Sequence, residues 1–218
     1  MLKRLSRAMM LSLAMQSPPR LFSLLYGFNW YGGTMRDWVM GLPLPQGANV
    51  LELGCGPGDL GVDMAKLGYE VHGVDRSNKM ISRASKHKTD AIFTQADAYD
   101  LPMVDNTYDA VLLSSLINVV PDRTKLLTEV HRVLKPGGVI SALFPIPEFT
   151  IVKAEKISAK LNLPHWSSVA MSTWAMASRK LEPLEISNEF SAARFKTIST
   201  AKYLNDCIVS ITAFKPKF

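Results

Sequence analysis

The stretch NVLELGCGPGD, residues 49–59, has the spacing of a ligand-binding loop. Three glycines at alternate positions, Gly54, Gly56 and Gly58, follow an apolar run that carries a carboxylate, Glu52. Glycine has no side chain, so the backbone at the end of a strand can approach a ligand closely. A carboxylate beside such a loop favours a positively charged ligand over a pyrophosphate. The stretch therefore predicts a binding loop for a small cationic molecule.

A second nucleotide pattern overlaps the same loop. Gly56, Gly58 and Gly61 satisfy G-x-G-x-x-G, and Asp75 follows Gly56 by 19 residues, as in the dinucleotide fingerprint. That pattern keeps an NAD(P)-dependent oxidoreductase open as an alternative. Glu52 counts against it, because the dinucleotide fingerprint does not call for a carboxylate at the end of the first strand.

The loop must be positioned by alternating strands and helices. Strand-like runs lie at residues 49–53, 70–75, 91–97, 109–115 and 139–144, and amphipathic helical stretches lie at 59–67, 77–87 and 123–134. Strands that alternate with helices pair in parallel and form a three-layer sandwich. Two further β-prone runs, 195–201 and 207–214, are joined by the short polar link KYLND and predict a hairpin. We expect a Rossmann-like α/β fold with a mostly parallel seven-stranded sheet and a C-terminal antiparallel hairpin.

The length and composition fit one domain. A chain of 218 residues with 47% hydrophobic and 20% charged residues can bury a single core. We divide it into an N-terminal helical lid (1–47), a ligand-binding core (48–144), a substrate-covering insertion (145–190) and the hairpin (191–218). Its two cysteines have no metal-binding spacing and fit a reducing compartment. We therefore expect a cytoplasmic protein without a metal site.

The basic residues gather at the two ends of the chain. Residues 1–47 carry a net charge of +4, residues 48–145 of −2, and residues 146–218 of +4. Such ends could contact phosphate groups, and the basic amphipathic pattern of residues 1–13 predicts peripheral membrane contact. A non-catalytic cofactor- or membrane-binding module stays open as an alternative. There is no arginine-rich tract or RNA-binding module, so a nucleic-acid partner is not expected.

Five segments in this order resemble one known family. LELGCGPGDLG, VDRS, ADAYDLP, DNTYDAVL and RVLKPGG, within roughly residues 48–144, are similar to the class I S-adenosylmethionine-dependent methyltransferases. The nearest branch is that of ubiquinone and menaquinone biosynthesis. The resemblance implies methyl transfer by in-line displacement to a small-molecule or lipid-like acceptor. An RNA methyltransferase stays open as an alternative. S-adenosyl-L-methionine would be the cofactor and S-adenosyl-L-homocysteine the product.

The resemblance also implies a set of cofactor-binding residues. These are Glu52, Gly54, Gly56, Gly58, Asp75, Arg76, Asp97, Ala98 and Ser114. Glu52 would face the amino and sulfonium charges, and Asp75 would accept hydrogen bonds from both ribose hydroxyls. Arg76 would flank the adenine, Asp97 would face its edge together with the backbone of Ala98, and Ser114 would lie near the methionine end. Ordinary helix-capping or turn roles for Asp75 and Asp97 stay open.

The sequence does not single out a catalytic residue. His165 lies in the covering insertion beside Trp166, but a lone histidine there is commonly a packing or surface residue. The segment LINVV (116–120) departs from the histidine- or aromatic-rich motif of the family and leaves Asn118 as its only polar side chain. Several aromatic residues precede the core and either pack as a lid or line an acceptor pocket. They are Phe22, Tyr26, Phe28, Trp30, Tyr31 and Trp38.

Overall fold

The computed structural model describes residue 12 and residues 16–217. The basic amphipathic segment predicted at residues 1–13 therefore lies, apart from Ser12, outside the described residues. No described helix is both long enough and apolar enough to cross a membrane.

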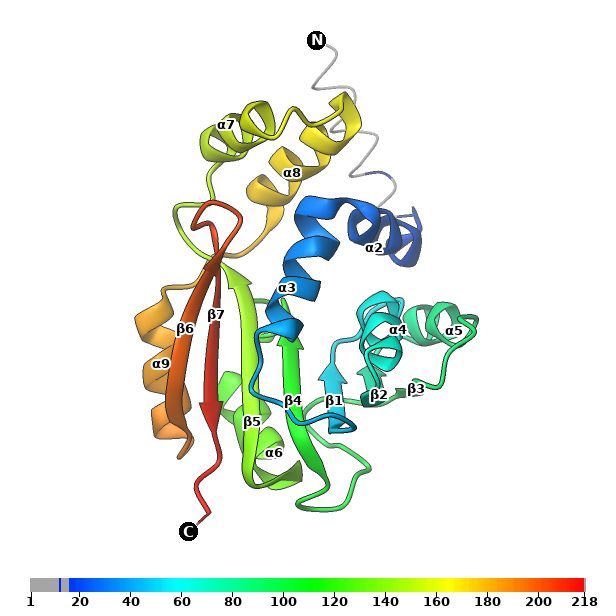
Figure 1. Cartoon of the computed structure of the whole chain (residues 1–218), viewed down its shortest axis with the longest axis vertical. Coiled ribbons are helices and arrows are strands. Elements are labelled where there is room, and N and C mark those ends of the chain that lie inside the picture. Colours follow the sequence, from blue (N-terminus) through cyan, green and yellow to red (C-terminus); the bar gives the residue numbers. More distant parts are fainter. Residues whose placement is uncertain (1–11, 13–15, 218) are drawn as a thin grey trace.

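The centre of the molecule is a seven-stranded mixed sheet (Figure 1). Its strands are β1 (Asn49–Leu53), β2 (Glu70–Asp75), β3 (Ile92–Gln95), β4 (Tyr108–Ser114), β5 (Leu134–Pro145), β6 (Lys196–Tyr203) and β7 (Ile208–Phe214). They lie in the order β3-β2-β1-β4-β5-β7-β6. The first five pair in parallel, and β7 pairs antiparallel with both β5 and β6. The predicted Rossmann-like sheet with its C-terminal hairpin is confirmed.

Helices cover both faces of the sheet and one of its ends. They are α2 (Pro18–Gly27), a π-helical turn η1 (Asn29–Gly33), α3 (Thr34–Met40), α4 (Asp59–Lys66), α5 (Asn78–Ala84), α6 (Arg123–Val133), α7 (Ile151–Lys160), α8 (His165–Ala177) and α9 (Pro183–Ala192). The three helices predicted within the core agree with α4, α5 and α6 to within a few residues. Each of these helices follows a parallel strand, either directly or after a loop. Because the strands run parallel, the residues at their carboxyl ends lie at one edge of the sheet.

Alternating side chains divide the core into two layers. Val50 and Leu112 pack with α3, α4, α7 and α8 on one face, whereas Leu51 and Leu113 pack with α6 and α9 on the other. This is the period of two that a strand buried on both faces requires. Glu52 has the same parity as Val50, so its side chain points toward the α3 and α4 layer.

We call α2, η1, α7 and α8 the cap. The cap lies over the carboxyl ends of β1, β4 and β5, at the top of Figure 1. Its N-terminal and C-terminal parts interlock, because the indole N–H of Trp30 in η1 donates to Ser167 Oγ in α8 at 2.8 Å. The cap is also tied to the core. Ser23 donates to Asp59 at 2.9 Å, and the Tyr26 hydroxyl donates to Asp63 at 2.8 Å.

Two segments lie differently from the sequence expectation. β5 begins at Leu134 instead of residue 139, and its pairing with β4 shifts register between Tyr108 and Ala110. The expected covering insertion 145–190 is divided in the structure, because α9 packs on β6, β7 and α6 and not over the strand ends. Arg123 of α6 donates to Glu189 of α9 at 2.6 Å, which holds α9 against the sheet face.

Candidate functional site

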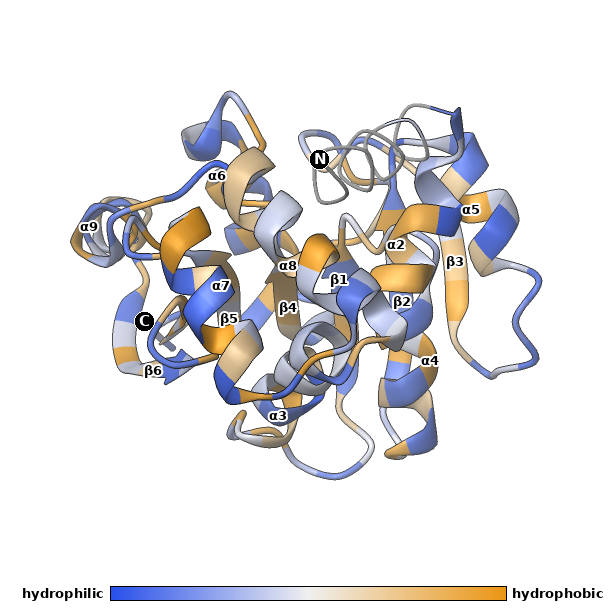
Figure 2. Cartoon of the chain, turned by 90° about the horizontal axis from the view of Figure 1, so that it is seen from above, coloured by the Kyte–Doolittle hydropathy of each residue, from blue (hydrophilic) through white to orange (hydrophobic). Residues whose placement is uncertain are grey.

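A cavity of about 930 Å³ lies between the strand ends and the cap. Its walls come from the carboxyl ends of β1, β2 and β4, the segment after β3, the start of α4, and cap elements α2, η1 and α8. Figure 2 looks down on this end, with α8 and α2 over the sheet. In open α/β sheets this edge is where ligands bind. The volume is within the range of small-molecule sites.

All the sequence-predicted site residues except Gly58 line this cavity. The eight that do are Glu52, Gly54, Gly56, Asp75, Arg76, Asp97, Ala98 and Ser114. They come from four strand ends that are neighbours in the sheet but are separated by up to 62 residues in the chain. The topology therefore brings them together.

Two glycines of the loop line the cavity but differ in what surrounds them. Gly56 has φ +53°, and a Cβ added there would meet nothing within 4 Å. Gly54 has φ +72°, and an added Cβ would lie 3.0 Å from Leu116 Cδ1. Both backbone conformations are ones that glycine adopts without strain. At Gly56 the missing side chain leaves open space on the ligand side.

Gly58 serves packing instead of the cavity. A Cβ there would lie 2.8 Å from both Ala84 Cβ and the ring of Phe93. Added Cβ atoms at Gly61 and Gly73 would also meet the Phe93 ring, at 3.1 and 2.6 Å. Three glycines thus form a socket for one phenylalanine of β3. The G-x-G-x-x-G match at residues 56–61 is in part a packing pattern, which weakens it as a dinucleotide signal.

Glu52 is the most perturbed acid of the site. It is 2% exposed, and its Oε2 has no hydrogen-bond partner. Burial, together with the negative charges of Asp59 and Asp75, raises its pKa from 4.5 to about 8. A buried carboxyl without a partner is costly, so this position is complementary to a cation or a hydrogen-bond donor supplied by a ligand.

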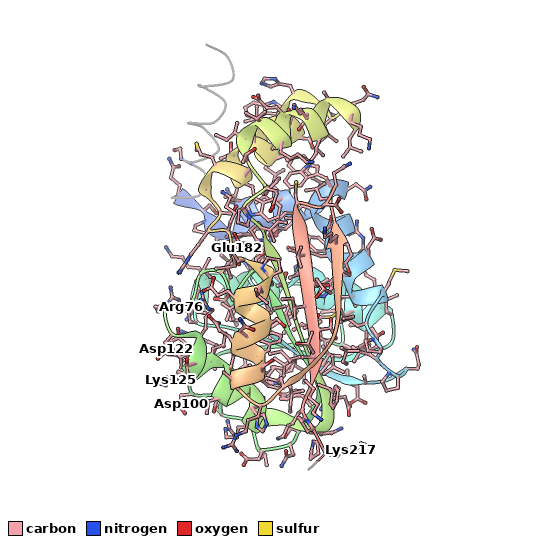
Figure 3. All side chains as sticks on the ribbon, turned by 90° about the vertical axis from the view of Figure 1, so that its left-hand side faces the viewer. Arg76, Asp100, Asp122, Lys125, Glu182 and Lys217 are labelled. Atoms are coloured by element: carbon pink, nitrogen blue, oxygen red, sulfur yellow. The ribbon has the colours of Figure 1, made fainter. Side chains whose placement is uncertain are left out.

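Asp75 ends β2 with its carboxylate fixed by the backbone. Its Oδ2 accepts from the Gly56 N–H at 3.0 Å, and its Oδ1 accepts from the Ser77 N–H at 2.8 Å. Each carboxylate oxygen retains a further lone pair for a ligand hydroxyl. Arg76 is exposed at the rim, and Figure 3 shows it at the outer side of the molecule.

The segment after β3 forms a tight turn beside Asp75. Asp97 is exposed, and its Oδ1 accepts from the Tyr99 N–H at 2.9 Å. The turn closes with the Asp100 N–H donating to the Asp97 carbonyl at 3.0 Å. The turn role left open for Asp97 is therefore present in the structure. Asp97 and Ala98 also line the cavity, so a turn role and a ligand role are compatible.

Ser114 lies at the end of β4, in the wall that faces the cap. Its hydroxyl contacts Met35 Sδ of α3 at 3.6 Å. The next residue, Ser115, has φ +56°, a strained conformation for a residue with a side chain. Its N–H donates to the Leu143 carbonyl at 2.9 Å, which stabilises the turn. Such strain is frequent where a chain positions a functional group.

The cap contributes an aromatic wall to the cavity. Trp174 lies at the centre of this wall, and the sequence did not single it out. Trp174 of α8 packs against Trp30, Tyr31 and Phe149, with ring centroids 5.8, 4.9 and 5.1 Å away. Trp174 and Tyr31 line the cavity. Burial, and then the nearby Glu52, raises the pKa of Tyr31, so its phenol stays protonated. A locked indole and a neutral phenol form a wall suited to an apolar ring.

None of the four histidines lines the cavity. His72 lies in β2 with its ring nitrogens 2.9 Å from the hydroxyls of Tyr108 and Thr94. His87 contacts the Pro57 carbonyl at 3.0 Å, and His131 stacks edge-on with a phenylalanine of the hairpin. His165 is exposed at the start of α8. Within the described residues no group of His, Cys, Asp or Glu could hold a metal ion.

Comparisons with known proteins agree with the geometry of the site. Residues 51–142 match the family model described as a methyltransferase domain. Over 119 residues the chain is 36% identical to demethylmenaquinone methyltransferase of Lactiplantibacillus plantarum, covering 49% of this chain and 50% of that protein. Over 127 residues it is 33% identical to 27-O-demethylrifamycin SV methyltransferase of Amycolatopsis mediterranei, covering 53% and 47%. The chain spans about half the length of the curated relatives it matches.

Solved structures extend the likeness over most of the chain. One is a chain of the complex between the Haloferax volcanii Trm112 methyltransferase activator and a methyltransferase. Its TM-score is 0.70 at 16% identity, over 94% of this chain and 96% of that one. A S-adenosylmethionine-dependent methyltransferase from Methanosarcina mazei gives 0.62 at 18%, over 82% and 97%. At these identities the structures show a shared fold. The sequence matches thus show a methyltransferase domain at residues 51–142, and the structures show that most of the chain shares their fold.

Proposed function

We propose that the protein transfers a methyl group from S-adenosylmethionine to a small, apolar or lipid-like acceptor held under the cap. The observation that carries this proposal is Glu52. It is a buried carboxyl, unpartnered at Oε2, beside a loop whose Gly56 opens to the cavity. A ligand with an ammonium and a sulfonium group supplies the positive charge that this position lacks.

The dimensions of the strand edge fit the proposed cofactor. Asp97 follows β3, Asp75 ends β2, Glu52 lies near the end of β1, and Ser114 ends β4. These strands are consecutive in the sheet. Three strand intervals of about 4.8 Å span about 14 Å, which is sufficient for an extended nucleoside with an amino-acid tail. We assign the adenosine end to the β2 and β3 side, and the reacting end to the β1 and β4 side.

A sulfonium supplies an already activated methyl group, so the protein's tasks are alignment and exclusion of water. We assign the exclusion to the cap, because α2 and α8 line the cavity above the strand ends. The hydrogen bonds of Ser23 to Asp59 and of Tyr26 to Asp63 hold α2 against α4. Met35, whose Sδ lies 3.6 Å from the Ser114 hydroxyl, limits the space beside Ser114, where the acceptor would approach.

The acceptor half of the cavity is mainly apolar. Its cap-side lining includes Leu21, Phe22, Leu25, Tyr31, Ala170, Trp174 and Ala177. Among the residues that the structure describes, no histidine or lysine lines the cavity, and the Tyr31 phenol has a raised pKa. We infer an acceptor that ionises readily by itself or is nucleophilic when neutral. The curated relatives are named for a demethylmenaquinone and a demethylrifamycin, which supports a small-molecule acceptor.

The charge at the start of α4 favours this proposal over a dinucleotide. A pyrophosphate would bind at the N-terminus of the helix after the glycine loop. Asp59 occupies the first turn of α4 and lines the cavity, and Glu52 lies behind it. The carboxylate of Asp59 at that point would repel a diphosphate. We therefore rank an NAD(P)-dependent oxidoreductase below a methyltransferase.

Calorimetric titration with S-adenosylhomocysteine tests the cofactor. We expect binding in the micromolar range, and weaker binding by at least tenfold in Asp75→Asn. NAD and NADP in the same assay should give no heat of binding. Acceptors are then screened with methyl-labelled donor, including quinols extracted from membranes. Lack of binding at high micromolar S-adenosylhomocysteine, or undiminished affinity in Asp75→Asn, would overturn the proposal. RNA in the same screen tests the RNA alternative, with salt dependence of binding as its readout.

A further inference from the structure

Three buried side-chain atoms among the described residues have no hydrogen-bond partner. They are Glu52 Oε2, Asn118 Oδ1 and Ser178 Oγ. All three residues line the same cavity. Buried polar groups in folded proteins are nearly always paired, so three unpaired ones at one cavity indicate that a ligand supplies the partners. The proposed cofactor accounts for Glu52, whereas nothing in the cofactor's assigned place accounts for the other two.

The side-chain amide of Asn118, a residue that lines the cavity, has a fixed orientation. The residue is 3% exposed, and its Nδ2 donates to the Arg179 carbonyl at 3.2 Å. Turning the amide over would place two oxygens against each other, so this bond determines which atom is left over. The remaining atom, Oδ1, can only accept. It therefore requires a ligand group that carries an O–H or N–H.

Ser178 presents a hydroxyl next to the same point. It follows the last residue of α8, and its own N–H donates to the Trp174 carbonyl at 2.9 Å. Its backbone is therefore satisfied, and only Oγ lacks a partner. Because Asn118 is bonded to the carbonyl of the next residue, Arg179, the loop after β4 and the end of α8 meet here. A hydroxyl can donate as well as accept.

Apolar residues line the cavity close to Asn118 and Ser178 in the chain. They include Val120 and Trp174, whereas Val119 and Ala177, which also line it, are exposed to solvent. The hydroxyl of Thr173, which also lines the cavity, is already used in a bond to the Val169 carbonyl at 2.7 Å. In such a setting an analogue that lacks the matching polar group leaves buried atoms unpaired, and discrimination against it is strong.

Resting on the proposed function, we propose that Asn118 and Ser178 recognise a hydroxyl group on an otherwise apolar, ring-containing acceptor. The acceptor's hydroxyl hydrogen is donated to Asn118 Oδ1, and its oxygen accepts from Ser178 Oγ. The rings lie against Trp174, whose indole is fixed by three aromatic neighbours. The substrate class is thus a hydroxylated aromatic or fused-ring small molecule.

The test compares two probes that differ only at the recognised group. 2-Naphthol and 2-methylnaphthalene have the same fused rings, with a hydroxyl in one where the other has a methyl. Binding to the full chain is measured by ligand-observed NMR, with and without saturating S-adenosylhomocysteine. We expect the wild-type protein to prefer 2-naphthol by tenfold or more. The variants are Asn118→Leu and Ser178→Ala, and Thr173→Val is the matched control that removes a hydroxyl already bonded elsewhere.

We expect Asn118→Leu to reduce the preference for 2-naphthol to below threefold, and Ser178→Ala to reduce it in part. Thr173→Val should retain it. Equal binding of the two probes to the wild type, or an unchanged preference in both Asn118→Leu and Ser178→Ala, would overturn the inference. Thermal unfolding checks that each variant is folded. If Asn118→Leu does not fold, the preference of Ser178→Ala for 2-naphthol alone tests the inference. Loss of S-adenosylhomocysteine binding in the wild type would instead count against the proposed function, because the probe preference is also measured without it.

Discussion

Glu52→Gln tests whether the buried carboxyl group of β1 binds a positively charged ligand. Glu52 is 2% exposed, and burial with two neighbouring carboxylates raises its pKa from 4.5 to about 8. In the ligand-free protein at pH 7 it is therefore about nine-tenths protonated. A ligand with positive charge lowers that pKa again and releases the proton. Glutamine retains the shape of the side chain and removes the titration.

The magnitude for the ligand-free protein follows from the two pKa values. Above pH 4.5 the unfolded chain loses this proton while the folded protein keeps it, so the folded state is disfavoured as the pH rises. The free energy of unfolding should fall by at most about 1.4 kcal/mol per pH unit from this group, and level off above about pH 8. Over the whole interval the upper limit is about 5 kcal/mol. Asp63, Asp109 and Glu129, whose pKa values are lowered, have the opposite effect in both proteins and cancel in the comparison.

Two measurements check this expectation. Urea unfolding at several pH values between 5 and 9 should show a steeper decline for the wild type than for Glu52→Gln. Calorimetry with S-adenosylmethionine in two buffers of different ionisation enthalpy should show release of about 0.9 proton at pH 7 in the wild type. That release should be small at pH 9 and lost in Glu52→Gln. Equal proton release in both proteins, or parallel stability profiles, would refute the assignment of the perturbed carboxyl to Glu52.

Four further substitutions separate packing, cap and cofactor roles. Gly56→Ala, at φ +53° with open space around the added methyl, should cost about 1–2 kcal/mol of stability but weaken S-adenosylhomocysteine binding at least tenfold by titration. Gly58→Ala clashes with packed side chains and should cost roughly 3 kcal/mol or more in urea unfolding; similar stability losses at both glycines would contradict the distinction. Tyr26→Phe removes the bond to Asp63 and should raise the dissociation rate of S-adenosylhomocysteine about fivefold in stopped-flow displacement, whereas an unchanged rate would exclude α2 as a closing element. Asp75→Asn should lower methyl transfer at subsaturating cofactor more than at saturating cofactor, and a loss confined to the maximal rate would argue against a binding role.

The sheet was predictable because its strands carry their own local signals. β1 and β2 agree with the sequence prediction at both ends, since each is an apolar run bounded by a turn or a helix start. The start of β5 was not predictable in this way. Lys135–Gly138 has the composition of a turn. In the structure it instead lies within β5, where the pairing with β4 shifts register. The N–H of Gly137, which has φ +83°, donates to the Lys215 carbonyl. The start of β5 is therefore set by pairing with a strand that is distant in the sequence.

The gathering of strand-end residues in one cavity was predictable for the same reason, and the cap side of the cavity was not. Glu52, Asp75 and Ser114 each lie at or next to a strand end, and parallel topology brings strand ends to one edge whatever the intervening sequence. Gly58 is the exception on that side, because a side chain there would clash with Ala84 and with Phe93, 35 residues later in the chain, and its φ of +85° also favours glycine.

The acceptor wall instead depends on contacts between segments with no shared periodicity. Trp30 reaches Ser167 across 137 residues, and Asn118 reaches the end of α8 across 61. Because the cap is held by these few long-range contacts, a small change in α8 can alter the acceptor half without disturbing the sheet. Relatives that match over the domain at residues 51–142 can therefore share a cofactor half and still differ in acceptor. It follows that residues such as Asn118 and Ser178, and not the glycine loop, are the ones to exchange when the acceptor preference is to be changed.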